Sequence, residues 1–146
     1  MRDIKLSPLK TIEDNRGSVK HMLRNDSPCF LGMGELYIST VKFRAVKAWK
    51  RHLKMTQNIA VPIGTIKIVL FDNRSLGFKE AQIQEIELGE ENYQLLHIPP
   101  MIWYGFCGLS KTDGLIVNCA DIVYDSDEVE RLPENTLSIP YDWQKA

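Results

Sequence analysis

Cysteine is scarce in this sequence, and the few thiols follow no ligand or disulfide pattern. The three cysteines, Cys29, Cys107 and Cys119, are odd in number and show no CxxC spacing. Free buried thiols in a reducing compartment are the plain interpretation of such a set. We therefore expect a cytoplasmic protein.

Long apolar runs and an excess of one charge are also absent. No run approaches the ~20 apolar residues of a membrane span, and the first ten residues lack the apolar core of a signal peptide. The net charge of -1 gives no reason to expect nucleic acid as a partner. We expect neither a membrane nor a nucleic-acid partner. The length of 146 residues predicts one domain, residues 1–146, that buries roughly 70% of its unfolded surface.

What the sequence does contain is a series of short strand patterns. The central stretch 46–72 predicts three strands, and its last part, TIKIVLFD, has the β-branched and aromatic composition of a buried strand. In the first of them Lys50 and His52 are two residues apart, which places both on one face together with Ala48. Further strand patterns cover 4–12, 18–24, 35–43, 81–88 with a bulge at Gln84–Glu85, 93–98, 103–106 and 115–120.

These nine or ten strands, with turn signals every 8–12 residues, predict an all-β protein. A cupin jelly roll, in which two sheets form a barrel, fits best. The acidic segment 125–134 predicts one short helix, and 139–143 predicts a tail with an aromatic anchor. Edge strands of such sheets often pair across a two-fold axis, so we expect a homodimer.

Several segments carry a resemblance to a known family. They are Asp14-Asn15-Arg16-Gly17, Val46-Lys47-Ala48-Trp49-Lys50, Ile98-Pro99-Pro100, Trp103-Tyr104-Gly105-Phe106 and Ile139-Pro140-Tyr141-Asp142-Trp143. Through them the chain resembles the dTDP-4-dehydrorhamnose 3,5-epimerase group of cupins and its shorter relatives from surface-polysaccharide gene clusters. The resemblance runs from Leu9 to Trp143.

The resemblance implies a nucleotide-sugar site inside the barrel. In the family a dTDP-linked 4-keto-6-deoxy sugar loses the proton α to its ketone to a histidine, and a tyrosine on the opposite ring face returns one. A lysine stabilises the enolate oxygen and arginines hold the diphosphate. By motif register, Arg16 matches one of these arginines. Lys47 matches another and keeps the charge, but a lysine cannot form the bidentate pair of hydrogen bonds that an arginine forms.

The chain departs from the family at the reacting residues. Lys50 takes the place of the basic histidine, with His52 two residues on, and Gln57 takes the place of the lysine. The second histidine aligns with Tyr104, and the family tyrosine falls near Ile122 or Val123, close to Tyr124. The usual histidine, tyrosine and lysine set is therefore not preserved.

Two residues are candidate bases. Lys50 can act as a base only if its pKa falls by about three units, which corresponds to roughly 4 kcal/mol. Burial and neighbouring cations act in that direction, although a solvated side chain or a diphosphate ligand is the commoner explanation of such a lysine. His52 titrates near neutral pH and is the better base on its pKa alone. The alternative for His52 is a hydrogen-bonded residue of the barrel wall.

The remaining candidates bind or protonate the substrate. Trp103 and Tyr104 are adjacent, so one faces inward, where it either stacks on a base or sugar or packs in the core. Tyr104 is the candidate general acid. Arg16 beside Gly17 suits a diphosphate contact, against the alternative of a surface turn arginine. Asn118 is a candidate hydrogen-bond partner of the sugar. His21 is predicted to be a core residue and His97 to lie outside the barrel.

Other chemistries find no support in the sequence. A metal-binding cupin needs an H-x-H pair with a nearby Glu and a distant His, whereas residues 50–55 hold one imidazole and three cations. We therefore expect no metal and no cofactor. No G-x-S-x-G, P-loop or dinucleotide-binding motif is present, so hydrolase and nucleotide-hydrolysis activities lack support.

Two functions remain. The first is a cofactor-independent nucleotide-sugar epimerase or isomerase acting next to a 4-keto group, with a site formed by the candidate catalytic residues Lys50, His52 and Tyr104 and the candidate substrate-binding residues Arg16, Lys47, Gln57, Trp103 and Asn118. The alternative is a non-catalytic cupin that binds a nucleotide sugar or a partner protein.

Overall fold

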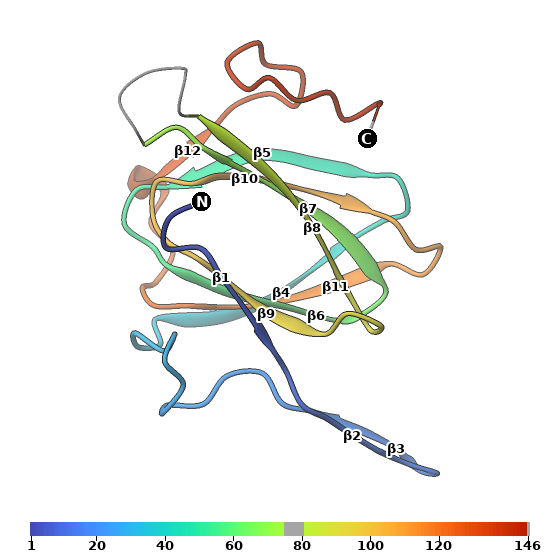
Figure 1. Ribbon diagram of the computed structural model, residues 1–146. Coiled ribbons are helices and arrows are strands. Elements are labelled where there is room, and N and C mark those ends of the chain that lie inside the picture. The colour runs from blue at the N-terminus through green and yellow to red at the C-terminus, as the bar shows by residue number, and fades with distance from the viewer. Residues whose placement is uncertain (75–80, 146) are drawn as a thin grey trace.

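The computed structural model describes residues 1–74 and 81–145, and it is built almost entirely of strands (Figure 1). They are β1 (Lys5–Pro8), β2 (Thr11–Asp14), β3 (Gly17–Lys20), β4 (Glu35–Val41), β5 (Val46–His52), β6 (Gln57–Ile63), β7 (Thr65–Asp72), β8 (Gln82–Gly89), β9 (Gln94–Ile98), β10 (Trp103–Gly108), β11 (Gly114–Ala120) and β12 (Val129–Arg131). The acidic segment forms only the 3₁₀ turn η1 (Ser126–Glu128), followed directly by β12, and not the longer helix predicted.

Two five-stranded antiparallel sheets face each other (Figure 1). One has the strand order β1-β9-β6-β11-β4 and the other β12-β5-β10-β7-β8, while β2 and β3 form a separate hairpin. This arrangement confirms the predicted all-β, cupin-like jelly roll. In the described ranges no helix is long and apolar enough to cross a membrane.

The space between the sheets is filled mainly by hydrocarbon. Strands β6 and β7 are buried over most of their length, which explains their near-continuous apolar sequences. The inward side chains interlock in one cluster: Val41, Ile59, Val61, Ile66, Ile68, Leu70, Ile86, Leu88, Leu96, Ile98, Ile102, Tyr104 and Ile116. Burying a side chain of this size contributes roughly 1.5–3 kcal/mol, so this cluster holds the sheets together.

A second apolar cluster lies on the outer face of the β5–β10–β7 sheet. Trp49, Trp103 and Phe71 pack there against the C-terminal tail, which crosses above β5 and β10 in Figure 1. The ring centroids of Tyr141 and Trp143 lie 5.9 Å and 5.1 Å from that of Trp49. The predicted aromatic anchor of the tail is thus present.

The register of β5 against β10 shifts once, and the shift decides which side chains face inward. Tyr104 pairs with Lys50, but Phe106 pairs with Lys47, so β5 contains one extra residue between the two pairs. Ala48 consequently packs with the outer cluster. The prediction that Ala48 shares a face with Lys50 and His52 was wrong for this reason.

Three smaller predictions also change. Strand β8 pairs with β7 in unbroken register, so the predicted bulge at Gln84–Glu85 is absent. His21 is exposed beyond the end of β3, not part of the core. His97 does alternate with the inward Leu96 and Ile98 as predicted, but it is buried, with Nδ1 2.9 Å from Asn58 Oδ1.

Candidate active site

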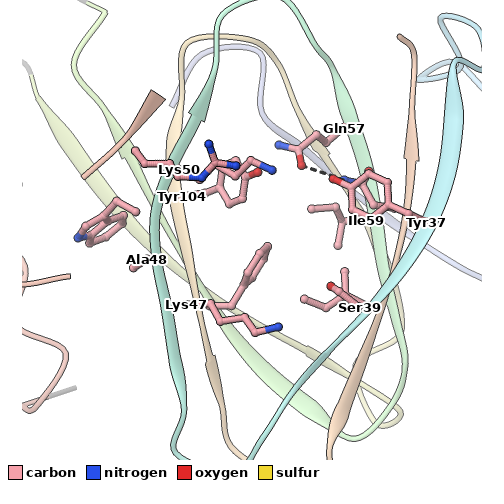
Figure 2. A pocket seen from close by; sticks show the side chains of 13 residues that line it. Tyr37, Ser39, Lys47, Ala48, Lys50, Gln57, Ile59 and Tyr104 are labelled. Carbon is pink, nitrogen blue, oxygen red and sulfur yellow. Dashed lines mark hydrogen bonds between the residues drawn. The ribbon is translucent and has the colours of Figure 1, made fainter. Parts of the chain in front are cut away.

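A cavity of about 320 Å³ opens between the two sheets. Side chains of β4, β6 and β11 form one wall, and those of β5, β10 and β12 form the other. Figure 2 shows Lys50 and Tyr104 on one side of this space and Tyr37 and Gln57 on the other. The residues around the cavity are Tyr37, Ser39, Lys47, Ala48, Trp49, Lys50, Gln57, Ile59, Tyr104, Phe106, Ile116, Asn118 and Arg131. Ala48 and Trp49 belong to the stretch of β5 that borders the cavity, and they pack in the outer cluster.

Three cations reach the cavity. Lys50 and Arg131 are direct neighbours on β5 and β12, while Lys47 lies farther along β5, where its Nζ donates a hydrogen bond of 2.5 Å to Thr40 O. Burial lowers the pKa of Lys50, and the positive charge of Arg131 lowers it further. The Lys50 amine is therefore more easily deprotonated than a solvated lysine.

Behind this wall His52 forms a buried pair with Glu128. His52 Nδ1 hydrogen-bonds to Glu128 Oε1, and Oε2 of the same carboxylate accepts bonds from Lys54 N at 3.1 Å and Met55 N at 3.2 Å. Burial opposes ionisation of Glu128, but the bond from His52 and the two amide bonds outweigh it and lower the pKa of the carboxyl. Burial also lowers the pKa of His52, more than Glu128 raises it.

The pair therefore consists of a carboxylate and a neutral imidazole. The Nδ1 proton of His52 points at Glu128, which leaves Nε2 as a lone-pair acceptor. In the described part of the chain this Nε2 is buried and has no hydrogen-bond partner. An imidazole in this state has the protonation of a general base.

Tyr104 lies between His52 and the cavity. The two rings are nearly parallel, with an interplanar angle of 13° and centroids 6.1 Å apart. Burial raises the pKa of Tyr104 strongly, and the nearby Tyr37 raises it further, whereas a hydrogen bond from Gln57 acts in the opposite direction. Tyr104 is therefore a protonated phenol at neutral pH and a hydrogen-bond donor.

The opposite wall carries a polar group formed by Tyr37, Gln57 and Asn118. Asn118 Nδ2 lies 2.7 Å from Tyr37 Oη and 2.8 Å from Gln57 Oε1. Burial raises the pKa of Tyr37 too, so this second phenol is also protonated. The two walls thus face each other with an amine and a phenol on one side and a phenol and two amides on the other.

Most of the predicted site residues come together here. Lys47, Lys50, Gln57, Tyr104 and Asn118 all line the cavity. His52 does not line it and is buried next to Tyr104.

Two predicted residues are elsewhere. Trp103 faces outward, because adjacent residues of β10 alternate, and its ring packs in the outer cluster with the Arg51 guanidinium 4.6 Å above it. Its assignment to the substrate site is corrected accordingly. Arg16 is exposed in the turn of the β2–β3 hairpin, which extends away from the barrel in Figure 1, and it pairs with Asp14 at 2.6 Å.

Sequence reasoning missed four residues: Tyr37, Ser39, Glu128 and Arg131. Tyr37 and Ser39 alternate with the exposed Leu36 and Ile38 on β4, and this period-two pattern carried the signal for them. Glu128 sits in an acidic run that resembles a solvated segment, so nothing in the sequence separates it from its neighbours.

The rim of the cavity holds one more aromatic residue. The Tyr124 ring centroid lies 5.7 Å from Lys50 Nζ, and its hydroxyl oxygen lies 3.4 Å from Arg131 Nη2. Among residues 1–74 and 81–145, no group of three or more His, Cys, Asp or Glu side chains is placed to hold a metal ion.

Comparison with known proteins agrees with this geometry. The model of the family described as FdtA: WxcM-like, C-terminal matches residues 2–136. The chain is 45% identical to a dTDP sugar isomerase from Desulfovibrio desulfuricans, with a TM-score of 0.94, over 99% of this chain and 93% of the other. It is 29% identical to the probable low-salt glycan biosynthesis epimerase Agl13 of Haloferax volcanii, over 98% of this chain and 94% of that protein.

Two further relatives extend the comparison. The spore coat polysaccharide biosynthesis protein SpsL of Bacillus subtilis is 25% identical over 96% of this chain and 94% of its own length. A dTDP-4-dehydrorhamnose 3,5-epimerase from Elizabethkingia anophelis shares the fold, with a TM-score of 0.79 at 17% identity, over 98% of this chain and 82% of the other. The resemblance to this group of cupins, expected from the sequence, is confirmed.

Proposed function

Because the chain belongs to the FdtA, WxcM-like C-terminal family, we propose that it is a cytoplasmic epimerase or isomerase of a dTDP-4-keto-6-deoxyhexose, acting in surface-polysaccharide biosynthesis. It removes the proton next to the 4-keto group without a cofactor. The observation that carries this proposal is a half-buried lysine of lowered pKa lining the same cavity as two protonated phenols. Glycan biosynthesis by the relatives Agl13 and SpsL supports the pathway.

The proposed reaction begins at Lys50. Its neutral amine takes the proton from the carbon next to the ketone, and the electrons of the C–H bond move to the carbonyl oxygen, which becomes an enolate. Tyr104, a protonated phenol on the adjacent strand, is the acid that returns a proton. Return to the same carbon from the other face gives epimerisation. Return to the former carbonyl carbon gives a shifted ketone, because the hydroxyl on the deprotonated carbon loses its proton and becomes the new carbonyl, while the former enolate oxygen takes up a proton and becomes a hydroxyl.

His52 is the alternative base. It is neutral, and its Nε2 has no hydrogen-bond partner among residues 1–74 and 81–145, but it lies behind Tyr104 and not at the cavity wall. Lys50 is the better placed of the two, and the two assignments are separated by comparing Lys50→Met with His52→Gln. A general base contributes typically 10²–10⁴-fold to a rate, so only the variant that removes the base should lose exchange on that scale.

Cations at the mouth of the cavity suit the diphosphate. Lys47 and Arg131 line the cavity and are solvent-exposed, which lets them bind phosphate without being buried unpaired. Arg16 is too far along the projecting hairpin to join them within one chain. We propose a homodimer in which this hairpin contacts the second copy, because Ile12 and Val19 on it and Leu36 and Ile38 on β4 are exposed apolar residues.

The decisive experiment is isotope exchange. Incubation with dTDP-4-keto-6-deoxyglucose in deuterated water should place deuterium at C3 or C5 of the sugar if it is epimerised, or at C4 if the ketone shifts, as read by NMR. Lys50→Ala should abolish this exchange and leave binding of TDP intact. Binding without any exchange in the wild-type protein would instead identify a non-catalytic nucleotide-sugar-binding cupin. Light scattering of the purified chain tests the homodimer separately.

A further inference from the structure

The hydrogen bonds on the second wall have only one consistent direction. An amide nitrogen donates and never accepts. Asn118 Nδ2 must therefore donate one N–H to Tyr37 Oη and the other to Gln57 Oε1. Since Gln57 Oε1 accepts, the nitrogen of the Gln57 amide is left to donate, and the influence of Gln57 lowers the pKa of Tyr104.

The Tyr37 hydroxyl consequently serves as an acceptor within this network. It still has its own O–H, which the amides do not use and which is available to the cavity that Tyr37 lines. The chain of bonds runs from Tyr37 on β4 through Asn118 on β11 to Gln57 on β6, so it joins the three strands of this wall. Gln57 and Asn118 are each only 2% exposed, which fixes the amides in place.

One atom of the network also points to a ligand. Asn118 Oδ1 is buried and, in the described ranges, has no hydrogen-bond partner. A buried carbonyl oxygen without a donor costs roughly 1–3 kcal/mol. A sugar hydroxyl in the cavity would supply the missing donor.

We propose that Gln57 and Asn118 are positioning residues that hold Tyr37 as a hydrogen-bond donor to the substrate's carbonyl oxygen, and that Tyr37 is a further catalytic residue. This inference rests on the proposed function. The negative charge that develops on the oxygen during proton abstraction is stabilised by the Tyr37 phenol. Because burial raises the pKa of Tyr37, this phenol keeps its proton at neutral pH. Donors fixed before the reaction need no reorganisation as the charge develops.

The test reverses the direction of the network. In Asn118→Asp a carboxylate of nearly the same shape can only accept, so Tyr37 must turn its O–H toward it and away from the cavity. Removing one such donor costs about 10²–10³ in kcat, and we expect a loss on that scale in both Tyr37→Phe and Asn118→Asp. In the double variant, Tyr37→Phe should add less than about threefold to the loss already caused by Asn118→Asp, since the donor is already turned away.

The exchange rate with dTDP-4-keto-6-deoxyglucose is the first measurement, and calorimetric binding of TDP and thermal melting confirm that each variant is folded. Tyr93→Phe, which changes a tyrosine outside the cavity, is the matched control and should leave the rate unchanged. Rates of Tyr37→Phe close to wild type, or fully additive losses in the double variant, would overturn the inference.

A second measurement separates this inference from the proposed function. If the wild-type protein exchanges no deuterium, the proposed function fails, and the affinities for dTDP-4-keto-6-deoxyglucose and dTDP-glucose then decide the inference. A preference for the ketone that Tyr37→Phe abolishes supports Tyr37 as a donor to the carbonyl oxygen. Equal preferences in the wild type and the variant contradict it.

Discussion

The inner and outer faces of the β5–β10 pair carry closely matched residues with opposite surroundings. On the inner face Lys50 lies beside Tyr104, and on the outer face Arg51 lies over Trp103. Each face thus pairs a cation with an aromatic ring. The C-terminal tail covers the outer pair, whereas a cavity of about 320 Å³ lies over the inner pair.

The comparison shows that residue type alone does not make a site. The Arg51 guanidinium hydrogen-bonds to Glu130 and stacks on Trp103, so its charge and its planar group already have partners. Lys50 has no acidic partner within 4.0 Å in the described ranges, and its strongest influences are burial and the like charge of Arg131. An amine left in this state is available for proton transfer.

The largest expected effect comes from exchanging each cation for an apolar side chain. Lys50→Met should lower the deuterium-exchange rate by about 10²–10⁴-fold, because it removes the proposed base. Arg51→Met, the matched change one residue along on the outer face, should keep the exchange rate. The NMR exchange assay measures both. Equal losses in the two variants would show that the inner face has no special role.

The aromatic residues give the second comparison. Trp103→Ala should lower the free energy of unfolding by about 3–5 kcal/mol, since it empties a large volume under the tail. Tyr104→Phe keeps the ring, so it should change stability little. It removes the hydroxyl of the proposed acid, so it should lower the exchange rate. Urea unfolding and the exchange assay separate the two effects. A variant of Trp103 that is stable but slow would restore this residue to the substrate site.

Periodicity made the fold predictable. Strand patterns of alternating residues, such as the one across Leu36 to Ser39, follow from the pleat, and the turn signals set their spacing. Burial on both faces explains why β6 and β7 read as continuous apolar runs. The resemblance through residues 46–50, 98–106 and 139–143 then selected the cupin arrangement among all-β folds.

The site was predictable only in part, for two physical reasons. The shift of register between Tyr104 and Phe106 changes the phase of β5 and moves Ala48 to the outer face, and no residue type in the sequence marks it. The partner of His52 is Glu128, 76 residues away. Alternation within a strand says nothing about such distant contacts, which depend on how η1 and β12 return to the barrel.

A smaller effect is expected from the buried imidazole of the inner face. The pKa of His52 is lowered in the folded state, so the unfolded chain binds a proton first as the pH falls through its ordinary value near 6.5. Stability should therefore fall on acidification below about pH 6.5, with a slope of at most about 1.36 kcal/mol per pH unit from this group. His52→Gln should reduce the slope, and the exposed His21→Gln is the matched control. Urea midpoints at several pH values measure it, and identical slopes in all three proteins would refute the assignment.

The smallest effect sharpens the comparison of the two cations themselves. Arg131 lowers the pKa of Lys50 from the neighbouring strand, so Arg131→Gln should raise that pKa. Because a base must be neutral to act, a higher pKa of Lys50 should move the acid limb of the pH–rate profile to higher pH. The rate at pH 7 should therefore be lower. Exposed charges interact by roughly 0.2–1 kcal/mol, which limits the loss of rate to about fivefold at saturating substrate.

Arg51→Gln is the control. Arg51 lies on the other face and is already paired with Glu130, so this variant should leave the acid limb in place. A limb that does not move in Arg131→Gln would mean that the base is not Lys50, because Arg131 is the neighbouring charge that lowers the pKa of that amine.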